Sequence, residues 1–181
     1  MNTKLLLTTV AGMTVLTGCW SGPVMSLHPL YTNDDLASDP VLKGSWKLDE
    51  KCVLTIRQSA KNHDELVCSE KDGASTMEVH VVRLAGSQFR DLMWGDTGGI
   101  PAHSFAKIDL LSRDEMSLAV FGSEWLDKEI AARGIPHEVV GENDDKTVLT
   151  AYTLELQQFV LSYVSQSDAF EEHGSVLNRL P

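Results

Sequence analysis

From residue 41 onward, the chain is a series of short segments in which apolar and polar residues tend to alternate. Clusters of Gly, Asn, Asp and Ser separate most of these segments. Short strands bounded by such turn signals at regular spacing are typical of an antiparallel meander, in which one face of each strand is apolar. Strands are predicted at residues 43–48, 52–58, 65–70, 76–84, 88–94, 104–112, 115–121, 137–140 and 147–152, and residues 176–180 can return as a final strand.

Two helices interrupt these strands. Ser123 can cap a helix over residues 124–133, and Gly134 with Pro136 ends it. A second helix is predicted after Thr153 as its cap, because apolar residues recur there at helical spacing. They form one face: Leu156, Phe159, Val160, Tyr163 and Val164. Since that face must pack on something, the predicted fold class is α+β and β-rich, with an antiparallel meander that forms a bent sheet or small barrel and two helices packed on it.

The N-terminus has the layout of an export signal. Its first four residues carry one lysine, residues 5–16 are apolar or small, and the chain then reads Leu16-Thr17-Gly18-Cys19. The apolar run is shorter than the ~20 residues that a membrane-spanning helix needs. The segment Leu16-Thr17-Gly18-Cys19 resembles the lipobox of bacterial lipoproteins. This resemblance implies cleavage before Cys19, a diacylglycerol on its thiol and acylation of the new amine, which together would anchor the protein in a membrane.

The residue after the cysteine is Trp20. In the lipoproteins that this leader resembles, an aspartate at that position favours the inner membrane, so Trp20 implies an outer-membrane anchor that faces the periplasm. The expected organisation is a signal peptide at 1–18, a lipidated tether at 19–40 and a single β-rich domain at 41–181. The tether is expected because its residues mix Gly, Pro, Ser, Asn and Asp with scattered apolar side chains.

The chain is acidic. Its 181 residues carry a formal net charge of −11, and removing the leader with its one charged residue, Lys4, makes that charge −12. Such a surface argues against nucleic-acid binding and against electrostatic docking on anionic lipid. It suits solubility or a basic protein partner.

Two further cysteines, Cys52 and Cys68, fall on neighbouring predicted strands, and an exported address permits a disulfide. A hairpin in which the numbers of paired residues sum to 120 places Cys52 opposite Cys68 and keeps most apolar residues on one face. A non-hydrogen-bonded pair of this kind lies close to bridging distance. We therefore predict a Cys52–Cys68 disulfide, which would stabilise the fold by ~3 kcal/mol. The alternative is two buried free thiols.

No spacing in the sequence points to a catalytic or metal centre. None of the six histidines forms an H-x-H or H-E-x-x-H pair. Glu78 and His80 share a strand face, but a metal site would need a third ligand that the sequence does not locate. The glycine-rich residues 95–99 lack the Lys and Ser/Thr of a phosphate-binding loop, and no G-x-S-x-G nucleophile elbow is present. We expect no catalytic residue, no metal and no cofactor.

Two resemblances extend into the domain. Gly44-Ser45-Trp46 on the first strand resembles the start of lipocalins, in which the tryptophan packs across the base of the barrel, although the later lipocalin signatures are absent. Blocks at 27–46, 83–94, 100–110 and 149–160 resemble uncharacterised bacterial lipoproteins in order and spacing. The second resemblance implies one exported domain and carries no activity or site residues.

The expected function is a non-enzymatic, lipid-anchored envelope protein that binds a small ligand or an envelope partner. An apolar cavity would favour a carrier of small hydrophobic or lipid molecules. An acidic outer face would favour a basic partner, for example in an inhibitor resembling the lysozyme-inhibitor lipoproteins. The third class is a hydrolase acting on an envelope polymer, which two facing carboxylates, or a histidine next to a hydroxyl or carboxylate, would favour.

Overall fold

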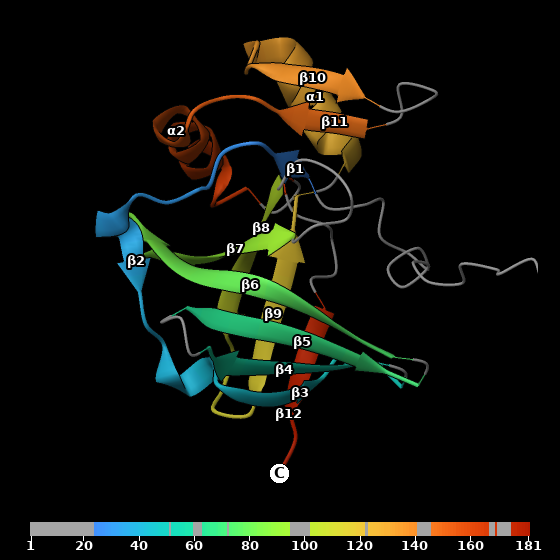
Figure 1. Ribbon diagram of the computed structural model, residues 1–181. Helices are drawn as coiled ribbons and strands as arrows, with labels where there is room; N and C mark the ends of the chain where they lie inside the picture. The colour runs from blue at the N-terminus through green and yellow to red at the C-terminus, as the bar shows by residue number, and fades with distance from the viewer. Residues whose placement is uncertain are drawn as a thin grey trace, which may run out of the picture.

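A computed structural model describes residues 24–50, 52–59, 63–71, 73–94, 102–121, 123–140, 146–166, 169 and 175–181. Within these residues, eight antiparallel strands close into a barrel (Figure 1). They are β3 (Gly44–Lys47), β4 (Val53–Gln58), β5 (Asp64–Glu70), β6 (Gly73–Leu84), β7 (Ser87–Trp94), β8 (Ala102–Leu110), β9 (Glu115–Val120) and β12 (Ser175–Arg179).

The barrel is a meander whose ends meet. Strands β3 to β9 pair in chain order, and β12 then pairs with both β9 and β3. The predicted fold class, a β-rich α+β domain with a small barrel and two helices, is therefore confirmed.

The register of the β4–β5 hairpin differs from the predicted one by two residues. Leu54, and not Cys52, is the direct partner of Cys68, and Ile56 pairs with Leu66. A shift of two residues leaves every side chain on its predicted face, because the strand repeat is two. The alternation of apolar residues therefore could not distinguish the two registers.

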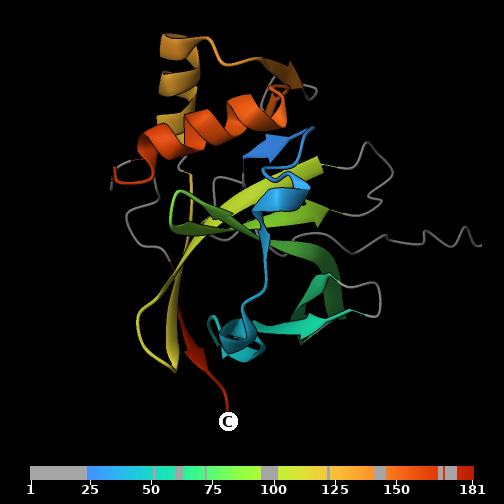
Figure 2. The same ribbon diagram turned by 90° about the vertical axis from the view of Figure 1, so that its left-hand side faces the viewer.

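A second group of elements packs on one side of the barrel. Both views place the helices with β10 and β11 on the upper side of the molecule and the C-terminus at the bottom (Figures 1 and 2). Strand β1 joins this group to the barrel, since it pairs with β11 in parallel and with β8 in antiparallel fashion. The elements are β1 (Met25–Ser26), α1 (Ser123–Arg133), β10 (His137–Val140), β11 (Lys146–Leu149) and α2 (Thr153–Tyr163).

The described part of the expected tether is folded onto the barrel. Besides β1 it forms two short 3₁₀ helices, η1 (Asn33–Asp35) and η2 (Pro40–Leu42), and the strand β2 (Leu36–Ala37), which pairs with β6. Leu30 is fully buried. The stretch from residue 24 therefore belongs to the packed structure, whereas the leader and Cys19 lie outside the described residues.

Helix α2 presents the predicted apolar face to the barrel side, with Leu156, Phe159, Val160 and Tyr163 buried. Its start differs from the prediction. The N-cap residue is Tyr152, and the Thr153 hydroxyl donates to the carbonyl oxygen of Pro29 at 2.9 Å. Thr153 therefore links the N-terminal segment to α2 through this hydrogen bond and does not cap the helix.

The apolar residues form two separate cores. The inner core lies inside the barrel and the outer core lies between the barrel and the helices. The inner core comprises Leu42, Trp46, Cys52, Leu54, Ile56, Cys68, Ile108, Met116 and Leu177. The outer core includes Val82, Leu84, Phe89, Phe105, Phe121, Leu126, Ile130, Leu149, Leu156, Phe159, Val160 and Tyr163.

Trp46 and Arg179 join the first and last strands of the barrel. The Arg179 guanidinium lies 4.1 Å from the centroid of the buried Trp46 ring, and its Nη1 donates to the Lys43 carbonyl at 2.9 Å. Gly44 passes close beside them with φ +128°, and a β-carbon there would lie 2.9 Å from that Nη1. The burial of Trp46 is equally what an ordinary core tryptophan would show, so it does not test the Gly-x-Trp resemblance. At position 44 only glycine fits the close approach.

Candidate functional site

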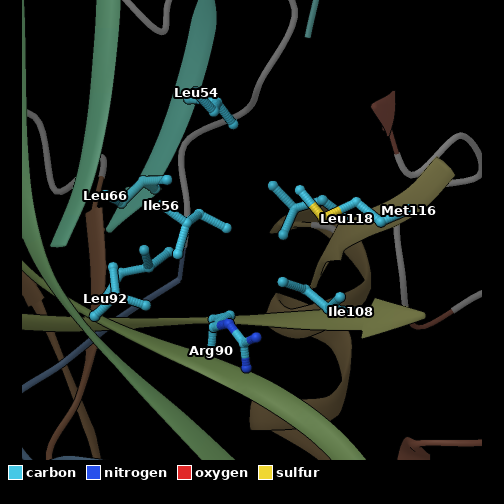
Figure 3. Close-up of a pocket in the computed structure, with 9 residues that line it drawn as sticks. Leu54, Ile56, Leu66, Arg90, Leu92, Ile108, Met116 and Leu118 are labelled. Carbon is cyan, nitrogen blue, oxygen red and sulfur yellow. The ribbon is translucent and has the colours of Figure 1, made fainter. Parts of the chain in front are cut away.

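The inner core contains a cavity of about 30 Å³ (Figure 3). This is room for about two water molecules. Apolar side chains from strands β4 to β9 make up most of its wall. Three of these side chains are only partly buried: Leu66, Leu92 and Leu118. The full lining is Leu54, Ile56, Leu66, Val79, Arg90, Leu92, Ile108, Met116 and Leu118.

Arg90 is the one charged residue in this wall. It extends from β7 into the barrel on the same strand face as Leu92, and only 3% of its surface is exposed (Figure 3). Its Nη1 donates to the carbonyl oxygen of Phe89 at 3.3 Å, but its buried Nε has no hydrogen-bond partner. Among the described residues, this is the sole buried side-chain nitrogen or oxygen left unpaired. An unpaired buried polar group normally costs stability, so it calls for an explanation.

The groups around Arg90 offset only part of the cost of burying its charge. Burial lowers the pKa of its guanidinium to about 10, and the charges of Asp39 and Asp64 only partly oppose that effect. Each of these carboxylates already has another partner: Gln88 donates to Asp39 at 3.0 Å, and Lys43 lies 3.6 Å from Asp64. Arg90 is therefore still a cation at neutral pH, held among aliphatic side chains.

The two predicted bridging cysteines meet at the inner core. Their Sγ atoms lie 2.6 Å apart although they are not direct strand partners. Burial, and then the neighbouring Cys68, raise the pKa of the Cys52 thiol well above its usual value, which disfavours a nucleophilic thiolate. The Glu70 carboxylate lies near both sulfurs. Two sulfurs on one tetrahedral zinc would be ~3.8 Å apart, so the pair fits a disulfide better than a metal site. The disulfide itself stays a prediction.

Glu78 and His80 share a strand face as predicted, and the structure adds a third group, His63. The Glu78 Oε1 atom lies 2.8 Å from Nε2 of His80 and 3.5 Å from Nδ1 of His63. The ring of Tyr31 packs on His80, with 4.5 Å between ring centroids. Burial raises the pKa of the Tyr31 hydroxyl, and the charges of Asp91 and Glu78 add to this effect. This cluster holds the N-terminal segment against β6.

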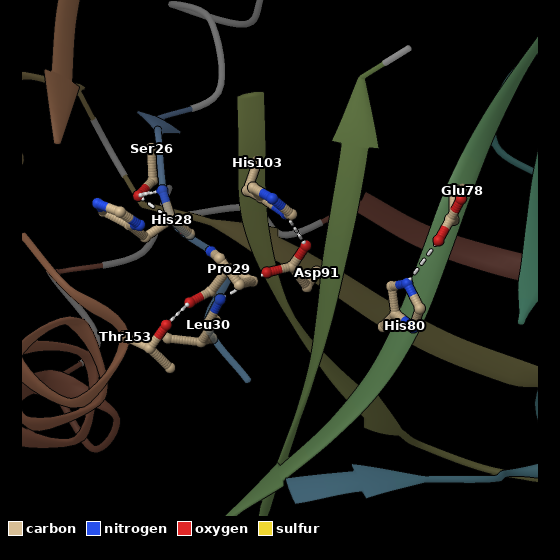
Figure 4. A network of polar contacts seen from close by, with 9 residues as sticks. All are labelled: Ser26, His28, Pro29, Leu30, Glu78, His80, Asp91, His103 and Thr153. Carbon is tan, nitrogen blue, oxygen red and sulfur yellow. Dashed lines mark hydrogen bonds and ion pairs between the residues drawn. The ribbon is translucent and has the colours of Figure 1, made fainter. Parts of the chain in front are cut away.

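A buried Asp–His pair lies under the same segment (Figure 4). Nδ1 of His103 lies 2.6 Å from Oδ1 of Asp91, and the backbone N–H of Leu30 donates to Oδ2 of Asp91 at 2.7 Å. Ser26 is the strand partner of His103, but its hydroxyl donates to the carbonyl of His28 at 2.9 Å. The Asp91–His103 pair therefore resembles a base with its orienting carboxylate, whereas the nearby hydroxyl is directed at the backbone.

The comparisons with known proteins found no relative of this chain. No protein-family model matches the chain, and searches of curated proteins and of solved structures found no significant similarity.

Proposed function

We propose that the protein is a lipid-anchored component of a bacterial cell envelope whose barrel binds a small ligand, and that it is not an enzyme. The observation that carries the binding role is the apolar cavity inside a closed barrel, with a buried guanidinium in its wall. Eight-stranded barrels are just wide enough to be filled by side chains or to hold one small ligand. The cavity of about 30 Å³ is far smaller than the ~300–1,000 Å³ of ordinary small-molecule sites, so binding requires a very small ligand or movement of the inner side chains.

The anchor proposal rests on the leader and on Leu16-Thr17-Gly18-Cys19. None of the described helices is long and apolar enough to cross a membrane. Lipid on Cys19 would hold the protein, with Trp20 favouring the outer membrane and a periplasmic orientation. A Cys19→Ser variant should lose lipid labelling and appear in the soluble envelope fraction. Retention of that variant in the membrane, with no lipid on the wild type, would contradict the anchor.

The binding proposal has a separate test. Native mass spectrometry of the purified full chain should detect a co-purified small molecule, or added small apolar compounds should shift the methyl resonances of Ile108 and Met116. A Leu66→Phe substitution should reduce this binding, because it fills the cavity. Leu154→Phe is the matched control, since Leu154 is 66% exposed on α2. Equal binding by both variants would place the ligand elsewhere.

The alternative function is a hydrolase acting on an envelope polymer, and the Asp91–His103 pair is the observation that favours it. In that case, His103→Ala should abolish turnover of a peptidoglycan or polysaccharide substrate while the fold survives. If the pair is structural, His103→Ala should lower the unfolding temperature, and no hydrolysis should be found in the wild type either.

A further inference from the structure

Two histidines and a glutamate meet on the outer face of the barrel. Glu78 and His80 are alternate residues of β6, so they share one face of that strand, and Val79 between them lines the cavity on the other face (Figure 4). His63 directly precedes β5. Asp64 is the strand partner of Val79, so the same register continued by one residue places His63 opposite His80. Strand pairing therefore brings the three side chains together.

Both histidines direct a ring nitrogen at the same carboxylate oxygen. Oε1 of Glu78 lies 2.8 Å from Nε2 of His80 and 3.5 Å from Nδ1 of His63. Two donor atoms on one tetrahedral zinc ion lie ~3.3 Å apart, and both distances are near that value. The two imidazoles are the donors that lie too far apart, because 6.0 Å separates their ring centroids, against ~5 Å for two imidazoles on one such ion. Binding of an ion would therefore draw the histidines together by about 1 Å.

The cluster would gain a counter-charge from a cation, and it is open to solvent. Among the described residues, the ion-pair partners of Glu78 are these two histidines, which are charged only if protonated. Neutral imidazoles leave the carboxylate without a counter-charge, and each of them has a nitrogen lone pair to offer. The exposed fractions of the side chains are 13% for His63, 28% for Glu78 and 15% for His80, so a small cation can reach them while the barrel stays folded.

We propose that Nδ1 of His63, Nε2 of His80 and a carboxylate oxygen of Glu78 bind one zinc ion, with water in the fourth position. Two imidazoles and one carboxylate suit zinc, whereas magnesium and calcium prefer sites made of oxygen atoms alone. His63 is the third ligand that the sequence alone does not locate. The zinc site goes beyond the proposed binding of a small ligand and is independent of it, because the cavity lies on the opposite face of β6.

Calorimetric titration of zinc chloride into the purified full chain measures the site. The wild type should bind zinc saturably and should not bind magnesium with comparable affinity. His63→Gln and His80→Gln should each weaken zinc binding more than about tenfold, because losing a ligand costs at least as much as losing a group that supports one. His137→Gln is the matched control, since His137 is exposed on β10, outside the cluster, and it should keep the wild-type affinity.

Cys52, Cys68 and Glu70 form another group of donors among the described residues, so the thiols need a control of their own. The Cys52→Ser/Cys68→Ser double variant should bind zinc as tightly as the wild type. Zinc binding that is lost in this variant and kept in His80→Gln would place the ion on the thiols and overturn the proposal. Absence of saturable zinc binding by the wild type, or equal affinity in His80→Gln and His137→Gln, would overturn it as well.

Two measurements on the wild type apply even if a variant fails to fold. Zinc should shift the imidazole resonances of His63 and His80 and leave those of His137 in place. It should also raise the urea concentration at which the chain unfolds, because an ion that binds the folded chain stabilises it. Resonances of His63 and His80 that do not move at saturating zinc would contradict the proposal.

Discussion

The inner and outer cores share strands β6, β7 and β8, whose opposite faces point into different surroundings. On the outer side, aromatic rings from α1, α2 and the residue after β9 pack on one another: the Trp125 ring is stacked on Phe121 with 5.4 Å between centroids and meets Tyr163 edge to face at 4.5 Å. On the inner face, mostly aliphatic side chains surround a cavity and one buried cation. Since protein interiors are normally close-packed, the outer core is an ordinary packed interior, whereas the inner core departs from that rule by leaving a cavity.

The largest effect is expected in the outer core. Phe159 on α2 has its ring centroid 5.2 Å from Tyr163 and 6.2 Å from Trp125. Phe159→Ala should lower the free energy of unfolding by ~3–5 kcal/mol, because it leaves a cavity among rings. Leu154→Ala on the exposed side of the same helix should change it little. Urea unfolding followed by circular dichroism measures both, and a similar loss in the two variants would contradict the packing described for α2.

The predicted disulfide would link Cys52 and Cys68 in the inner core. Replacing Cys52 and Cys68 together by serine should lower the free energy of unfolding by ~3 kcal/mol, through the loss of loop closure and of buried apolar volume. Thiol counting under denaturing conditions is the direct check. Two free thiols in protein folded in an oxidising compartment would show that the disulfide prediction is wrong.

Gly44 lies on β3, the strand that closes the barrel by pairing with β12. Gly44→Ala forces a side chain into a positive φ and brings its Cβ against Nη1 of Arg179, so it should cost ~1–3 kcal/mol. Gly73→Ala on β6 is the control, because a β-carbon there meets nothing within 4 Å. If both variants have the same unfolding midpoint, the contact between Gly44 and Arg179 does not constrain closure.

A matched pair on β6 compares the two cores directly. Val79 faces the cavity and Val82 faces the outer core, and both are buried. Val79→Leu should be neutral or stabilising by up to ~1 kcal/mol, because the extra methylene enters a void. Val82→Leu should destabilise by ~1 kcal/mol or more, because it overpacks. Calorimetric unfolding of both variants tests this, and destabilisation of equal size in the two would mean that the inner core is already full.

The smallest effect is expected at the polar rim of the outer core. The Asp35 carboxylate accepts from the Thr32 hydroxyl at 2.6 Å and from Gln157 of α2 at 2.8 Å. These bonds, with that from Thr32 first, lower the pKa of Asp35 below its ordinary value of 3.8. Its contribution to stability is therefore full above that value and is lost as the pH falls through the lowered folded-state pKa.

Asp35→Ala should accordingly destabilise the protein modestly near pH 7 and hardly at all near pH 2, when compared with the wild type at each pH. Asp34→Ala is the control for removing one exposed carboxylate from the same turn. A difference between wild type and Asp35→Ala that is unchanged at the lower pH would show that the carboxylate charge does not support this contact.

The local pattern predicted the strands and the buried face of α2, because alternation at periods of 2 and 3.6 depends only on neighbours along the chain. The scattered apolar residues before position 41 indicated that Leu30 could dock onto the domain, but not where, since the surface that buries Leu30 exists only after distant strands pair. The hairpin register was missed by two residues, because both registers keep Cys68 and Leu66 on the same face.

The site was harder to predict for the same reason. Arg90 shares a strand face with Leu92, so the alternation alone places it inward, but an arginine in a strand reads equally well as a solvated residue until the barrel closes. His63, the third group beside Glu78 and His80, lies just before the start of the neighbouring strand β5. Only the pairing of β5 with β6 brings it there. The burial of Arg90 and the position of His63 therefore both depend on strand pairing, which local sequence patterns do not reveal.

The most direct test of the binding account is a crystal structure of the full chain purified from the cell envelope. The account predicts electron density for a small organic molecule inside the barrel, between Leu92 and Ile108. A barrel interior that holds no organic molecule, with the cavity empty or filled by water, would contradict it.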